Sequence, residues 1–261
     1  MTSRADVIAA VAAYAPPQLQ ESWDNSGVQV GLGLDAPCTG VLVCVDVTPD
    51  VVAEALALGC NLIVSHHPLI FKGLRSITGA THVERAVADA LCSDIAVYSA
   101  HTSLDSAPGG ISHEMAAMLG ARVTAVLAPA EADPSVGLGV VAELPEPMDA
   151  DDFAALCART FGAQHLRRSA GTWRPVRRVA LCGGSGGEFI GRAVAAGADA
   201  YVTGDVRYHD FVDHGDRLLL VDVGHYESES CAKSIFYRVI TEKIPNFAVH
   251  YSNQLNPVQY L

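Results

Sequence analysis

The chain has 261 residues, half of them hydrophobic, and a formal net charge of −12 at pH 7. A chain of this length can bury a substantial core in one large domain or two modest ones. The acidic charge disfavours broad nucleic-acid binding, which depends on neutralising phosphates with Lys and Arg. No uninterrupted apolar run approaches the roughly 18 residues of a membrane span. We therefore expect neither nucleic acid nor membrane as a partner.

Two features of the sequence bear on the cellular compartment. Arg4 precedes an apolar stretch, residues 7–13, as in a short signal peptide. The spacing of Ser3 and Asp6 instead predicts a capped amphipathic helix that ends before Pro16. The seven cysteines show no C-x-x-C spacing, which favours reduced thiols over a disulfide framework. We therefore expect a cytoplasmic protein.

Residues 41–68 are predicted to form a β-α-β unit that ends in His66 and His67. Ligands gather at the carboxyl ends of strands in open parallel sheets, and Pro68 prevents simple continuation of a central strand. Two imidazoles at such an end indicate metal ligands, although a hydrogen-bonded structural role is the alternative. Asp46 also ends a strand, but the helix start that follows it explains that region by capping.

Two later predicted strands end in the same kinds of residue, namely His101 and Asp105 after residues 95–100, and His225 and Glu229 after residues 217–224. His225 and Glu229 are four residues apart at the start of a predicted helix, so both face one side of its first turn. Three strand ends that each deliver histidine or carboxylate predict a metal site.

Individual members of this set have structural alternatives. Asp105 is also suited to capping the turn at residues 108–110, and Glu229 to stabilising a helix N-terminus. His101 and Asp105 compete for one ligand position. We favour Asp105 as the ligand, because a carboxylate can bridge two cations. His101 is then the candidate catalytic residue, a proton shuttle, because imidazole titrates in the useful range.

The middle of the chain is predicted to form a second α/β unit. A strand at residues 176–182 runs into the glycine-rich segment 183–187, which favours either an anion site at a helix N-terminus or a tight turn. We predict a discontinuous metal-binding domain, residues 1–127 plus 217–261, and a second domain, residues 128–216. The first domain is discontinuous because the ligands after residue 217 must meet those before residue 106.

Several ordered segments together resemble the signature blocks of the GTP cyclohydrolase I type 2 homologues, also called Nif-three-like dinuclear metal-centre proteins. The matching segments are residues 21–31, 65–72, 100–110, 203–209 and 224–229. The similarity covers essentially the whole chain. It implies an α/β fold with two domains, mixed sheets flanked by helices, and a toroidal homohexamer.

The resemblance also implies a ligand set for two divalent metal ions per chain: His66, His67, Asp105, His225 and Glu229. Nitrogen and oxygen ligands suit zinc, manganese, iron, cobalt or nickel and do not choose among them. Two-metal sites activate water, so hydrolysis is the natural chemistry. The family name implies GTP cyclohydrolase activity, and hence a nucleotide-like small molecule as the substrate. The alternative is a non-catalytic metal-binding scaffold, or a metal-handling protein, that recruits partners.

Overall fold

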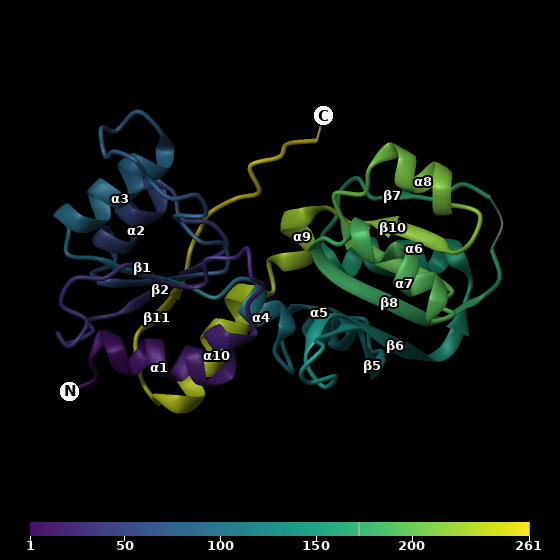
Figure 1. Ribbon diagram of the computed structural model, residues 1–261, viewed down its shortest axis with the longest axis horizontal. Helices are drawn as coiled ribbons and strands as arrows, with labels where there is room; N and C mark the ends of the chain where they lie inside the picture. The colour runs from purple at the N-terminus through teal and green to yellow at the C-terminus, as the bar shows by residue number, and fades with distance from the viewer. Residues whose placement is uncertain (172, 261) are drawn as a thin grey trace. The chain divides into compact units, whose positions relative to one another are not determined.

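The computed structural model describes residues 1–171 and 173–260 and divides into two compact units (Figure 1). The first unit consists of Met1–Ala107 and Ala232–Leu255, and the second of Pro108–Cys231 with the chain from Asn256 onward. The predicted boundaries, 127/128 and 216/217, differ from these divisions. The reason is that residues 122–129 and 219–222 are strands of the second unit's sheet.

The first unit contains a five-stranded mixed sheet in the order β1-β4-β3-β2-β11. Its strands are β1 (Gly27–Val30), β2 (Val41–Cys44), β3 (Leu62–Ser65), β4 (Ala96–Ser99) and β11 (Val249–Tyr251). All neighbouring strands are parallel except β1, which is antiparallel to β4. The strands β2, β3 and β4 are completely buried, as expected for parallel strands covered on both faces.

Helices cover both faces of this sheet. They are α1 (Arg4–Tyr14), the 3-10 helix η1 (Pro17–Leu19), α2 (Pro49–Ala57), α3 (His82–Cys92), α4 (Thr102–Ser106) and α10 (Ala232–Lys243). Figure 1 shows α2 and α3 on one side of the sheet and α1 and α10 on the other. The predicted start of α1 is confirmed, because Ser3 and Asp6 form a reciprocal capping box.

The second unit contains a six-stranded mixed sheet in the order β5-β6-β8-β9-β10-β7. Its strands are β5 (Arg122–Pro129), β6 (Gly137–Met148), β7 (Arg167–Arg168), β8 (Val176–Ser185), β9 (Ala200–Gly204) and β10 (Leu219–Asp222). The three central strands β8, β9 and β10 are parallel, and the outer strands are antiparallel to their neighbours. The helical elements are α5 (Ile111–Met118), α6 (Ala150–Phe161), η2 (Gly187–Phe189), α7 (Ile190–Ala195), α8 (Tyr208–His214) and α9 (His225–Glu229).

The predicted α/β class, with mixed sheets flanked by helices, is confirmed. Each of the three predicted ligand-bearing segments follows a parallel strand, β3, β4 or β10. Two of these strands are neighbours in the first sheet, and the third belongs to the second sheet. None of the described helices is both long and apolar enough to cross a membrane.

Candidate metal centre

Three histidines come together at the carboxyl ends of β3 and β4 in the first unit. His66 and His67 directly follow β3, and His101 follows β4, its parallel neighbour. One potential ligand nitrogen from each ring lies within 4.8 Å of the others. Asp105, on α4, places its Oδ1 3.8 Å from His66 Nε2. The first unit by itself therefore gathers three imidazoles and one carboxylate.

These three rings share one pattern of hydrogen bonds. Each donates from Nδ1 to an oxygen: His66 to the Ala100 carbonyl at 3.0 Å, His67 to Asp46 Oδ1 at 2.7 Å, and His101 to Asp24 Oδ1 at 2.8 Å. Because carbonyl and carboxylate oxygens can only accept, the proton of each neutral ring resides on Nδ1 and the lone pair on Nε2. Histidine ligands of metals almost always have such an outer partner, which fixes the tautomer and orients the ring.

Asp24, which orients His101, is itself held by several hydrogen bonds. Its side chain is completely buried and accepts hydrogen bonds from the His101 ring, from the Thr102 backbone and hydroxyl, and from the Ser26 hydroxyl. Burial favours the protonated form, but the hydrogen bonds from His101 and Thr102 outweigh it and hold the pKa of Asp24 well below its ordinary value. Asp24 is therefore an anion at neutral pH, suited to stabilising a protonated His101.

The second unit supplies a fourth histidine with the same pattern. His225 and Glu229 are the first and last residues of α9, and His225 Nε2 lies 3.0 Å from Glu229 Oε2. His225 Nδ1 donates to Asp205 Oδ2 at 2.8 Å. Glu229 is buried. The predicted (i, i+4) pair therefore faces one side of the helix, with its imidazole oriented by a carboxylate.

The glycine-rich end of β8 makes room for this pair. Gly184 has φ +62°, and a Cβ at this position would lie 2.1 Å from Glu229 Oε1 and 3.4 Å from His225 Cε1. Its amide donates to Ser228 Oγ at 2.9 Å. Of the two roles predicted for residues 183–187, the tight turn agrees with this packing, because the missing side chain admits the Glu229 carboxylate.

The segment before His225 is fixed by a buried carboxylate at the end of β10. Asp222 accepts hydrogen bonds from the Gly224 amide at 3.0 Å, from the Val206 amide at 3.1 Å and from the guanidinium of Arg167. Gly224 has φ +94°, a conformation that L residues rarely adopt. Asp222 therefore holds the end of β10 in the geometry that starts α9.

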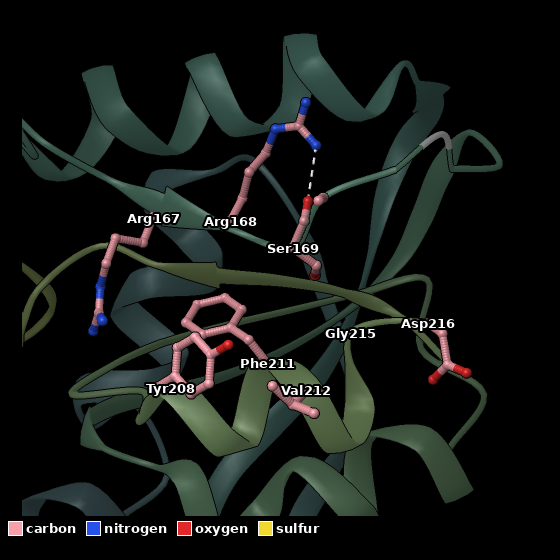
Figure 2. A pocket seen from close by; sticks show the side chains of 9 residues that line it. Arg167, Arg168, Ser169, Tyr208, Phe211, Val212, Gly215 and Asp216 are labelled. Atoms are coloured by element: carbon pink, nitrogen blue, oxygen red, sulfur yellow. Dashed lines mark hydrogen bonds between the residues drawn. The ribbon is translucent and has the colours of Figure 1, made fainter.

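Arg167 also lines a cavity of about 560 Å³ in the second unit (Figure 2). Figure 2 shows Tyr208, Phe211 and Val212 of α8 on one side and the β7 segment on the other. The guanidinium of Arg167 lies 5.6 Å from the centroid of the Phe211 ring. Among the described lining residues Asp216 carries the one carboxylate, and none is histidine or cysteine.

Each unit thus gathers part of the predicted site. The first unit gathers His66, His67 and His101 and places Asp105 beside them, and the second unit joins His225 to Glu229. His101 shares the geometry of the predicted ligands, so it is a candidate ligand as well as the predicted proton shuttle.

Sequence reasoning missed the carboxylates that orient the rings, which are Asp24, Asp46 and Asp205. It explained the region of Asp46 by helix capping, but Thr48 caps that helix and Asp46 binds His67. Two of the three carboxylates carried a signal. Asp46 lies just beyond β2, and Asp205 directly follows β9, so both occupy the ends of parallel strands.

An α/β chain that presents oriented imidazoles and carboxylates at strand ends belongs to the class of candidate metal-binding proteins. Comparison with known proteins gives the family. The sequence profile of Duf34/NIF3 (NGG1p interacting factor 3) matches residues 2–257, and the chain belongs to this family.

Relatives with the name GTP cyclohydrolase 1 type 2 homolog are similar along most of their length. The protein of Clostridium perfringens is 34% identical over 225 residues, which cover 86% of each chain. The protein of Streptomyces coelicolor is 36% identical over 235 residues, covering 88% of this chain and 82% of the relative.

Solved structures agree with the fold. A hypothetical protein of Staphylococcus aureus superimposes with a TM-score of 0.90 at 29% identity, covering 99% of both chains. A Bacillus cereus protein related to NIF3 gives a TM-score of 0.91 at 24% identity, covering 100% of this chain and 99% of that one.

Proposed function

We propose that this chain binds two divalent metal ions and acts as a metal-dependent hydrolase of a nucleotide-like small molecule. The observation that carries the proposal is the shared state of the histidines. His66, His67, His101 and His225 each donate from Nδ1 to an oxygen. Four imidazoles with the same orienting bond are expected of a metal centre, whereas unrelated structural histidines have no reason to share one tautomer.

The proposed ligands are His66, His67 and Asp105 of the first unit together with His225 and Glu229 of the second. This combination rests on the family resemblance. The donor set fits the proposal, since imidazole nitrogen and carboxylate oxygen suit zinc, manganese, iron, cobalt and nickel, and no thiolate is involved. When bound, such ions supply Lewis acidity and lower the pKa of water. Five protein ligands shared by two ions also leave positions for a substrate.

His101 and Asp24 are proposed to move the proton that hydrolysis releases or consumes. The lone pair on His101 Nε2 can accept a proton, and the buried Asp24 anion at 2.8 Å from Nδ1 stabilises the imidazolium that results. A nucleotide-like substrate is proposed because relatives carry the name GTP cyclohydrolase 1 type 2 homolog.

Elemental analysis of protein loaded with zinc or manganese tests the metal proposal. We expect close to two ions per chain, and lower occupancy in Asp105→Ala and Glu229→Ala. The matched control is His82→Ala, which removes an exposed imidazole at the start of α3. Full occupancy in both ligand variants would refute the assignment.

A turnover screen with nucleotides and related metabolites tests the hydrolase proposal. The metal-loaded protein should consume at least one compound, and the His67→Ala variant should not. If fully metallated protein hydrolyses no compound, GTP included, the non-catalytic alternative replaces the hydrolase: a scaffold or metal-handling protein that recruits partners.

A further inference from the structure

Two exposed aromatic side chains stand beside the histidine cluster of the first unit. Trp23 is 58% exposed and Phe71 is 47% exposed. The ring centroids of Trp23 and Phe71 lie 6.1 Å apart, and each lies 6.1 Å from the centroid of His101. All three pairs meet edge to face. The aromatic pair, Trp23 and Phe71, is therefore an apolar surface that is continuous with the candidate metal ligands.

The backbone on both sides of the aromatic pair is fixed by hydrogen bonds. Trp23 precedes Asp24, whose buried side chain is bonded to His101. Asn25 Nδ2 donates to the Ile70 carbonyl at 2.7 Å, and the Ile70 amide donates to Gln29 Oε1 at 3.1 Å. These bonds tie the Trp23 loop to the segment that carries Phe71. The backbone that carries the two rings is therefore held beside the histidine cluster.

Leaving two large aromatic side chains exposed forgoes their burial, which is a major source of stability for such residues. Aromatic faces of this kind stack on planar rings, and the interaction tolerates different bases because every base has a π-face. The segment after Phe71 carries exposed Lys72 and Arg75 in a chain of net charge −12. These two cations can pair with an anionic group on the same ligand.

We infer that Trp23 and Phe71 bind a planar heteroaromatic ring of the substrate and determine its specificity. The inference rests on the proposed function, since it assigns the ring to the molecule that the metal centre would hydrolyse. A compound with the same anionic group but no aromatic ring should bind much more weakly. The competing occupant of the aromatic pair is a second copy of this chain.

Tryptophan fluorescence provides a direct test, because the chain has two tryptophans, Trp23 and Trp173. In full-length, zinc-loaded Trp173→Phe protein, Trp23 is the single tryptophan. We expect saturable quenching by GMP, AMP or CMP, and none by ribose 5-phosphate, which lacks the ring. In the same background Phe71→Ala should raise the apparent Kd of the nucleotide roughly 5- to 150-fold, and Phe71→Tyr should restore the original Kd.

The matched control is Tyr251→Ala, which removes another exposed aromatic side chain of the first unit, one that stacks on Tyr237. It should leave the nucleotide Kd unchanged. Absence of saturable quenching by all three nucleotides, or an unchanged Kd in Phe71→Ala, would overturn the inference. If nucleotides cause no quenching and light scattering shows that Phe71→Ala changes the molecular mass of the assembly, the aromatic pair binds a second copy of this chain instead.

Metal content is measured on the same samples, so the two proposals fail separately. Two ions per chain without quenching would overturn the aromatic subsite and leave the metal proposal intact. Quenching without metal binding would overturn the metal proposal and leave the aromatic subsite intact.

Discussion

The substitution Gly184→Ala tests whether Glu229 is a metal ligand, without changing any ligand. The backbone at Gly184 has φ +62°, which costs an L residue about 1–2 kcal/mol. The new Cβ would also lie 2.1 Å from Glu229 Oε1, whereas real Cβ atoms essentially never approach closer than 3.0 Å. The carboxylate must therefore move by about 0.9 Å or more. Removing a group that merely orients a metal ligand lowers metal affinity roughly 10- to 100-fold, and displacing the ligand itself should lower it at least as much.

Gly197→Ala is the matched control in the same unit. Gly197 has φ +69°, and nothing lies within 4 Å of the position of its Cβ. In urea denaturation, Gly197→Ala should lose about 1–2 kcal/mol in the free energy of unfolding from the backbone cost alone, and Gly184→Ala should lose more, because the buried Glu229 carboxylate must also move. In zinc or manganese titrations by calorimetry, Gly184→Ala alone should bind more weakly. Equal metal affinity in the two variants would refute the role of Glu229.

Further predictions concern an orienting carboxylate, the thiols, the pH dependence of stability and assembly. Asp46→Ala removes the acceptor of His67 Nδ1 and should weaken metal binding roughly 10- to 100-fold in the same titration, while unchanged affinity would exclude His67 as an oriented ligand. Cys92 is the exposed thiol among the seven cysteines, and burial raises the pKa of Cys157 to about 12. A thiol reagent at pH 7 should therefore label one cysteine of the chain rapidly, and it should label no cysteine rapidly in Cys92→Ser. Burial lowers the pKa of His113 below 6.5, so the neutral form is favoured in the folded chain. The free energy of unfolding should therefore fall as the pH drops below about 6.5. An equally steep fall in His113→Gln would contradict this. Light scattering should give about six times the chain mass of 27.4 kDa, as the family resemblance implies, and a monomer at micromolar concentration would count against a hexamer.

The strand ends could be predicted from sequence because their signal is local. An apolar run that stops at histidine, as before His66 and His225, combines burial with an abrupt change to a ligand type. The parallel arrangement of β3 and β4 then follows from the β-α-β pattern, and it brings His66 and His101 to the same edge of the sheet.

The orienting carboxylates escaped prediction because their partners are distant in sequence. Asp24 and His101 are 77 residues apart, and Asp46 and His67 are 21 apart. Asp46 also lies next to a good helix start, and this local explanation concealed the long-range one. The sequence shows which residues can be ligands, but the hydrogen bond that selects one ring nitrogen depends on tertiary structure.

The domain boundaries illustrate the same limit. An Ala- and Pro-rich stretch near residue 130 is a plausible linker by composition, yet it borders β5, which pairs with β6 in the second sheet. The boundary between the two units follows from the pairing of strands, which cannot be read from amino-acid composition. The resemblance to a family carried the ligand assignment further than any local pattern.

The edge position of β11 has a consequence for synthesis of the chain. β11 pairs in parallel with β2, and the Ser252 amide adds a bond to the Val43 carbonyl at 2.9 Å. Ribosomes make β2 about two hundred residues before its edge partner. During that interval an apolar strand presents unpaired backbone groups, a template for association with other nascent chains. Expressing the first unit alone therefore requires residues 232–255 fused to residues 1–107, because a simple truncation would leave that edge open.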